Sequence, residues 1–375
     1  MVGRPWHKPR HPSFASGPAV KPSSWRLSSL DVSLLGRYHR TGEAVSRLRS
    51  ARALLRELLM IPPGHRLVPM VGSASGAMES ALWALLEPRY GVCALVWEHF
   101  GKLWANIAAM LVGDKLSVRH ADYGQVPNCQ DMTQEDVLFA WNGTTAGAWI
   151  GQSLPFGERP ADGLVFCDAT SVVFMHPLPW EQLDVVAFSL QKALGCEAFL
   201  GWLVLSEKAQ RRLAARPPAT KAAPHLLSLT DEHATLRMQP INSTSLLLLE
   251  DLRWCLDWAQ KQGGVASLAS KAWDNHRLMC DWVSACPWVD FLVPEAAHRP
   301  PAPLTLRLTD EENSEARVQA LCALLAQQGA AYDIQSHPQA PCGLRIWTGP
   351  TVETDDLQRL CQWLTWGYAQ INKQA

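Results

Sequence analysis

Short apolar runs alternate with stretches of helical spacing between residues 66 and 206, and this alternation limits the folds that the chain can adopt. Strands that are each followed by a helix form a largely parallel sheet with helices on both faces. The runs predict buried strands at Leu67–Val71, Cys93–Trp97, Val137–Trp141, Leu164–Cys167, Val185–Phe188 and Gly201–Leu205. Such sheets bind ligands at the carboxyl ends of their strands, so we expect the functional residues directly after these runs.

The chain changes character after a long helical stretch at about 245–285. It continues with a Pro-rich loop at 298–303, a strand at 304–308, a helix at 312–328, a strand at 343–347 and a terminal helix near 353–371. These patterns predict a smaller α+β domain. We therefore expect an α/β protein with a tail at 1–12, a large domain at 13–255 and a small C-terminal domain at 256–375. The length of 375 residues suits two domains or one large domain with an appendage.

Charge and cysteine usage exclude several classes of protein. The 34 Lys and Arg residues nearly balance the 35 Asp and Glu residues, so the chain lacks the basic excess of a nucleic-acid or membrane-surface binder. No apolar run reaches the roughly 18 residues of a membrane-spanning helix. The ten cysteines are scattered without a CxxC pair, which argues against a zinc site or a disulfide framework. We expect reduced thiols, no metal and a cytoplasmic location.

Three motifs follow predicted strands. The turn Gly72–Gly76, which contains Ala74 and Ser75, would offer an anion the N–H groups of a helix start. Asp168 directly follows an apolar strand, where it can hold a cationic ring nitrogen or cap the next turn. Lys192 follows another buried strand, and its amine either reaches water or acts as a nucleophile with a lowered pKa. Each motif alone also has an ordinary structural explanation.

The three motifs together indicate a cofactor. Pyridoxal 5′-phosphate needs partners for its phosphate, its ring nitrogen and its aldehyde, and an anion-binding turn, a carboxylate and an amine supply them in this order along the chain.

With these motifs in this order, the chain resembles the fold-type I, class V pyridoxal-phosphate aminotransferases. Within that class it resembles the phosphoserine aminotransferase family along nearly its whole length. The matching segments are Pro12–Pro18, Leu35–Arg40, Gly76–Trp83, Trp97–Trp104, Trp141–Gly147, Cys167–Ser171, Gln191–Lys192 and Gly343–Trp347. The resemblance implies a large domain with a mainly parallel mixed sheet flanked by helices, and a homodimer with active sites shared between the subunits.

The resemblance also implies roles for individual residues. Lys192 would form the Schiff base with the cofactor, and Asp168 would pair with the pyridinium nitrogen. Ala74 and Ser75 would hold the phosphate of the cofactor, and Trp104 would stack on its ring. Thr144 and Gln191 would be polar neighbours of the ring hydroxyl and the phosphate. Asn242 and Ser243 would reach the phosphate from the neighbouring subunit. The residues expected to recognise the anionic groups of the substrate are Ser16, His39, Arg40 and Arg345.

The activity that the resemblance implies is transamination, with glutamate as the donor and 3-phosphohydroxypyruvate as the acceptor, on the route to serine. Departures from the family pattern at Tyr38, Pro22 and Ser243 leave open a class V paralogue that acts on a different oxoacid. A cysteine desulfurase or related lyase would normally carry His before the lysine, where this chain has Gln191, and Cys342 is its one candidate thiol. A non-catalytic scaffold would more readily have lost Lys192 or Asp168.

Overall fold

The computed structural model describes residues 3–129, 132, 136–156, 162–215, 223–310 and 314–373. Its largest element is a seven-stranded sheet with the strand order β1-β9-β8-β7-β4-β2-β3. The strands are β1 (Arg66–Met70), β2 (Val92–Val96), β3 (Leu116–His120), β4 (Asp136–Ala140), β7 (Val165–Asp168), β8 (Val185–Phe188) and β9 (Gly201–Leu205). Within the described residues, β9 alone runs opposite to the other six strands of this sheet, so the expectation of a mainly parallel mixed sheet is confirmed.

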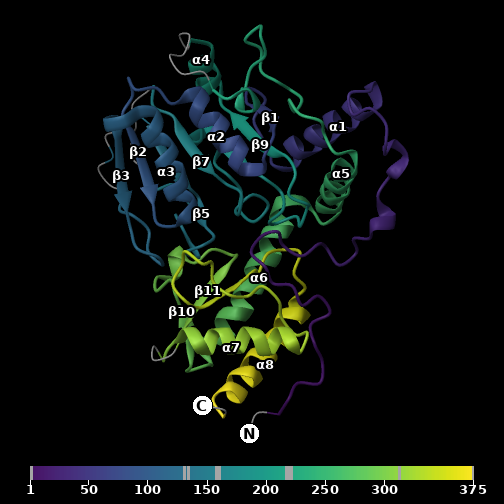
Figure 1. Cartoon of the computed structure of the whole chain (residues 1–375), viewed down its shortest axis with the longest axis vertical. Coiled ribbons are helices and arrows are strands. Elements are labelled where there is room, and N and C mark those ends of the chain that lie inside the picture. Colours follow the sequence, from purple (N-terminus) through teal and green to yellow (C-terminus); the bar gives the residue numbers. More distant parts are fainter. Residues whose placement is uncertain are drawn as a thin grey trace.

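Helices cover both faces of this sheet, because neighbouring side chains of a strand point to opposite sides. In β4, Leu138 belongs to the core under α2 (Ser73–Leu85) and α3 (His99–Val112). Val137 and Phe139 belong to the other core, which α1 (Gly42–Leu58) and α5 (Leu246–Lys261) help to close. Burial on both faces explains why the strands read as continuous apolar runs. Figure 1 shows α2 and α3 in front of the strands.

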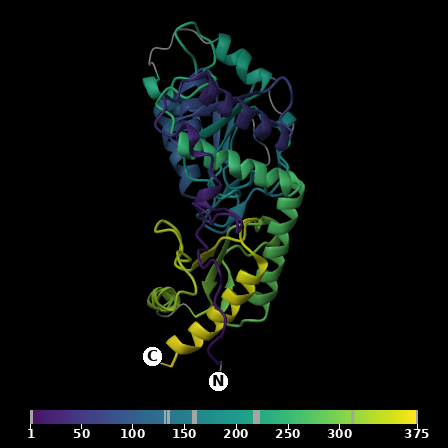
Figure 2. The same cartoon turned by 90° about the vertical axis from the view of Figure 1, so that its right-hand side faces the viewer.

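The C-terminal domain has its own three-stranded antiparallel sheet, formed by β10 (Val289–Phe291), β11 (Leu304–Leu308) and β12 (Leu344–Ile346). Helices α7 (Ser314–Gln327) and α8 (Thr354–Ile371) pack together, and α8 also packs on α6 (Gly264–Ser284). Figure 2 shows α6 running from the large domain along the side of the small one. The small α+β domain predicted from the sequence is thus present.

The structure differs from the sequence prediction in a few elements. The stretch expected as one helix at 245–285 is broken at Gly263, which has a left-handed φ of 94° and precedes α6. The proposed domain limit at residues 255 and 256 falls inside α5 and stays a prediction. Strands β3 and β10 were not expected, because β3 is a partly exposed edge strand with polar residues and β10 has three residues. The first expected residues of the helix at 312–328 lie outside the described residues.

The remaining described elements are short. Strands β5 (Asn142–Gly143) and β6 (Ala148–Trp149) form a hairpin after β4, and α4 (Glu207–Ala215) follows β9. None of the helices in the described ranges is both long and apolar enough to cross a membrane.

The N-terminal segment runs from the small domain to the edge of the large sheet. Arg10 N–H donates to Asp356 of α8 over 2.6 Å, and the backbone of Pro12 and Phe14 is bonded to that of Tyr332 and Trp347. Both labelled chain ends lie at the same end of the molecule, beyond α8 (Figure 1). The segment thus links α8 to the carboxyl ends of the large-domain strands.

Candidate active site

A cavity of about 220 Å³ opens at the carboxyl ends of the strands of the large sheet. Its walls come from the segments that follow β1, β4, β7 and β8, together with α3 and the N-terminal segment. Seven residues predicted to hold a cofactor line it together, namely Ala74, Ser75, Trp104, Thr144, Asp168, Gln191 and Lys192. The sheet topology thus collects motifs that are far apart in the sequence.

Lys192 follows β8 and projects its amine into this cavity. The amine donates a hydrogen bond to the backbone oxygen of Ser16, and any side chain at Gly17 would overlap it. Loss of water around the amine lowers its pKa to about 8, and the positive charge of Arg345 acts in the same direction. At neutral pH the amine is therefore far easier to deprotonate than that of an exposed lysine.

Asp168 is the last residue of β7 and is buried in the cavity wall. Its Oδ1 accepts hydrogen bonds from the backbone N–H and the hydroxyl of Thr170, and its Oδ2 accepts one from Trp104 Nε1 over 3.1 Å. Burial raises the pKa of the carboxyl, while the Thr170 and Trp104 hydrogen bonds and the charge of Lys192 oppose that rise. Asp168 lines the cavity together with the cationic Lys192, and these donors fix the orientation of its carboxylate.

The first turn of α2 forms another wall. The helix begins at Ser73, after Gly72 with a left-handed φ of 75°, so the predicted turn is itself the start of the helix. Ser73, Ala74 and Ser75 line the cavity, where the N–H groups and the dipole of the first turn favour an anion.

In and beside this cavity, three predicted site residues carry buried polar atoms that have no hydrogen-bond partner within the described residues: Ser16 Oγ, Gln191 Oε1 and Arg345 Nε. Buried polar atoms are normally paired, so these atoms indicate a polar ligand at this place. Together with the carboxylate, the amine and the helix start, they fit a flat heterocycle that carries a phosphate. The residues present are thus suited to pyridoxal phosphate.

Six predicted residues do not line this cavity. Two of them, Ser16 and Arg345, lie close to Lys192, and the other four lie elsewhere. His39 and Arg40 lie in a separate depression with Pro240 and Thr244, where Arg40 donates to the backbone oxygen of Ile241 over 3.1 Å. Asn242 and Ser243 are exposed on the same loop.

Sequence reasoning did not single out Thr170, which lines the cavity, or Glu98 and His337, which interact electrostatically with Lys192. Glu98 follows β2 and caps α3, and burial raises the pKa of its carboxyl to about 7. The ring of His337 lies 5.1 Å from that of His99, and burial and the nearby Arg345 lower the pKa of His337. The place of Glu98 after a buried strand was a usable signal, whereas His337 lies in a loop without a pattern.

The arrangement of the large sheet, the separate small sheet and this cavity define a pyridoxal-phosphate-dependent aminotransferase. Solved structures of aminotransferases share this fold. The phosphoserine aminotransferase of Cytophaga hutchinsonii superposes with a TM-score of 0.80 at 18% identity and covers 94% of this chain and 98% of its own. The alanine–glyoxylate aminotransferase of a Nostoc species has a TM-score of 0.78 at 17% identity, covering 98% and 97%.

The curated relatives identify the family. The phosphoserine aminotransferase of Methanosarcina mazei is 35% identical over 373 residues, which cover 97% of this chain and 99% of the relative. The phosphoserine aminotransferase of Methanosarcina barkeri matches with the same identity and coverage. No protein-family model matches the chain. The chain belongs to the phosphoserine aminotransferase family.

Proposed function

We propose that the chain is a pyridoxal-phosphate-dependent phosphoserine transaminase of serine biosynthesis, with glutamate as the amino donor and 3-phosphohydroxypyruvate as the acceptor. The observation that carries the chemistry is the pairing, in one cavity, of a lysine amine of pKa about 8 with a buried, triply hydrogen-bonded carboxylate. The family membership of the chain supports the substrate.

The cofactor, when bound, supplies an aldehyde and an electron-accepting ring. The N–H groups at Ala74 and Ser75 would hold its phosphate, and Asp168 would keep its ring nitrogen protonated. Trp104, which is only 1% exposed, would exclude water from one side of the ring. Thr144 and Gln191 would bond the remaining polar atoms.

Lys192 would act as the base at the substrate Cα and then return the proton. With a pKa of about 8, roughly one amine in ten is neutral at pH 7, compared with about one in several thousand for an ordinary lysine. Its hydrogen bond to the Ser16 backbone oxygen holds the amine at the cavity wall. A base is most effective when its pKa lies near the working pH.

Arg345 and Ser16 would bind the anionic groups of the substrate. The guanidinium of Arg345 is half-buried and lowers the pKa of Lys192 by its charge, and its Nε has no partner among the described residues. Such a planar fork suits a carboxylate or a phosphate.

We further propose a homodimer in which His39, Arg40, Asn242 and Ser243 reach the cavity of the second copy. These residues lie together but outside the cavity of their own chain. The neighbouring segment exposes Leu27, Val32 and Tyr38 by 61%, 53% and 63%, and a second copy could cover these apolar side chains. Ten free thiols support a reducing compartment, which we propose to be the cytoplasm.

The lyase alternative has little support from the one candidate thiol. Burial raises the pKa of Cys342, whereas a catalytic cysteine needs a lowered pKa. A paralogue with another oxoacid differs from our proposal only in its substrate.

A half-reaction screen tests the proposal. Purified holoenzyme is mixed with glutamate, phosphoserine, serine or alanine, and the absorbance of the cofactor is followed. We expect glutamate and phosphoserine to react, and phosphoserine to react far faster than serine. Equal rates for phosphoserine and serine would overturn the substrate and leave the transaminase class intact.

A further inference from the structure

The N-terminal segment at 16–21 lies along the loop that carries Lys192. The Lys192 amine donates to the backbone oxygen of Ser16, and Ala19 N–H donates to the backbone oxygen of Gln191 over 2.8 Å. Further along, Gly195 has a left-handed φ of 61°, and a Cβ at this position would lie 2.5 Å from the backbone oxygen of Val20. The N-terminal segment and the loop that carries Lys192 are therefore in contact at three successive places.

The ammonium of Lys21 closes this series of contacts. It donates to the backbone oxygen of Gly195 over 3.0 Å and to the Asp251 carboxylate over 2.9 and 3.1 Å, and it lies 3.2 Å from Glu197 Oε1. The side chain of Asp251 is only 3% exposed. Although burial lowers the pKa of Lys21, the hydrogen bond and the charge of Asp251 raise it above the ordinary value, so the amine stays charged.

Asp251 also holds the other end of the same loop. Its Oδ2 accepts a hydrogen bond from Glu197 N–H over 2.8 Å. One buried carboxylate on α5 thus holds Glu197 directly and Gly195 through Lys21. Gly195 N–H in turn bonds the backbone oxygen of Lys192 over 3.1 Å, which links the ion pair to the active-site lysine.

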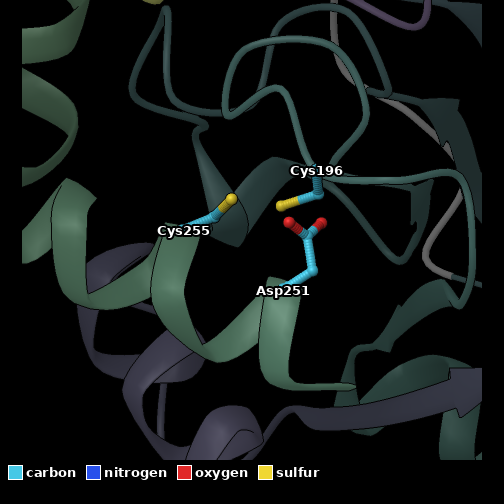
Figure 3. Close-up of side chains that lie close together, drawn as sticks. All are labelled: Cys196, Asp251 and Cys255. Atoms are coloured by element: carbon cyan, nitrogen blue, oxygen red, sulfur yellow. The ribbon is translucent and has the colours of Figure 1, made fainter. Parts of the chain in front are cut away.

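The side chains of Cys196, Asp251 and Cys255 meet behind this loop, and Figure 3 shows Cys196 on the loop facing Asp251 and Cys255 on α5. Two thiols and a carboxylate are ligands that a soft metal ion takes. However, both Asp251 oxygens are already bonded to Lys21, and burial and the neighbouring Cys255 keep the pKa of Cys196 well above its usual value. The cation held by this cluster is therefore the ammonium of Lys21 and not a metal ion.

We propose that Lys21 is a positioning residue for Lys192: its ammonium fills the Cys196–Asp251 cluster and ties the loop 192–197 to α5 and to the N-terminal segment. The inference rests on the proposed role of Lys192 as the base. Lys21 does not line the cavity, so its effect is on the placement of the amine and not on binding of the substrate.

The test compares Lys21→Met with a matched control, Lys208→Met. Lys208 also pairs with a buried aspartate, Asp184, over 3.0 Å and also donates to a backbone oxygen, that of Gly163. Asp184 precedes β8, so this pair lies at the amino end of the strand, whereas Lys192 follows its carboxyl end. Both variants lose a similar ion pair, and only Lys21→Met removes the contact with the Lys192 loop.

We expect kcat of Lys21→Met to fall at least about tenfold with less than about a twofold change in KM for the amino donor, because a small displacement of a reacting group is costly. Hydrogen exchange of the Gly195, Cys196 and Glu197 amides should accelerate in both apoenzyme and holoenzyme. The induced circular dichroism of the bound cofactor should weaken. Lys208→Met should change none of these, and Lys21→Arg, which keeps the charge, should restore part of kcat.

Exchange in 195–197 that is unchanged in Lys21→Met, or changed equally in Lys208→Met, would overturn the inference. If Lys21→Met does not fold because the Asp251 charge is left unpaired, Lys21→Met/Asp251→Asn removes that charge and keeps an oxygen for Glu197 N–H. Its exchange and kcat are then read in the same way. The exchange measurement needs no substrate, so a wrong substrate assignment would leave its result standing.

Discussion

Trp104 Nε1 donates a hydrogen bond to Asp168 Oδ2 over 3.1 Å, although the two residues are 64 positions apart. The indole therefore does more than supply a flat surface, because it also fixes one oxygen of the carboxylate that faces the cofactor site. The contact depends on β2 and β7 lying on either side of β4, which sets α3 beside the end of β7.

Replacing Trp104 by Phe should keep most of the aromatic surface and lose this hydrogen bond. We expect kcat/KM to fall about five- to tenfold, since a hydrogen bond to a charged group contributes about 1.5 kcal/mol or more and part of it is recovered by water.

Asp168→Asn should lower kcat/KM more than Trp104→Phe, about 100-fold, because the neutral amide cannot hold a protonated ring nitrogen. Steady-state kinetics measure both, and Trp254→Phe on α5 is the control. An activity of Asp168→Asn equal to wild type would contradict the role of Asp168.

Removing the Lys192 amine should abolish the reaction. For Lys192→Ala we expect at least a 10³-fold loss of kcat, the range of a lost general base. Borohydride treatment of wild-type holoenzyme followed by peptide mapping should find the reduced cofactor on Lys192, and Lys102→Ala, at an exposed position of α3, should behave as wild type. A label on any other lysine would remove the basis of the proposed function.

Arg345 should act on substrate affinity. Arg345→Lys keeps the charge but loses the planar fork, so we expect KM for phosphoserine to rise about 10- to 100-fold, the equivalent of about 1.5 to 3 kcal/mol. The thermal unfolding temperature should change little, because the guanidinium Nε has no partner within the described chain. Wild-type KM values of Arg345→Lys for both phosphoserine and glutamate would rule out this role.

Glu98 makes the stability of the apoenzyme depend on pH. Burial raises the pKa of its carboxyl from 4.5 to about 7. Between these two values the folded chain binds more protons than the unfolded chain, so the free energy of unfolding falls as the pH rises. The expected loss between pH 5 and pH 7.5 is about 2.4 kcal/mol. Urea unfolding at pH 5 and pH 7.5 should show this difference in wild type, and Glu98→Gln should lack it. An equal pH dependence in both proteins would contradict the shift.

Much of the sheet and the outline of the site could be predicted from the sequence, because buried parallel strands are apolar runs and their carboxyl ends carry the functional groups. The ion pair of Lys21 and Asp251 could not be predicted, since its partners are 230 positions apart and neither sits in a motif. The same holds for Thr170, whose hydroxyl looks like ordinary turn chemistry until Asp168 is seen to accept from it. The break between α5 and α6 was missed because the apolar spacing continues across Gly263.

The attachment of the N-terminal segment to α8 has a consequence for how the protein is made. Ribosomes synthesise residues 7–14 long before α8, yet His7 and Arg10 bond to Trp363 and Asp356 of that helix. The nascent segment therefore has no partners there while most of the chain is being translated. These contacts with α8 can form only after that helix has left the ribosomal tunnel.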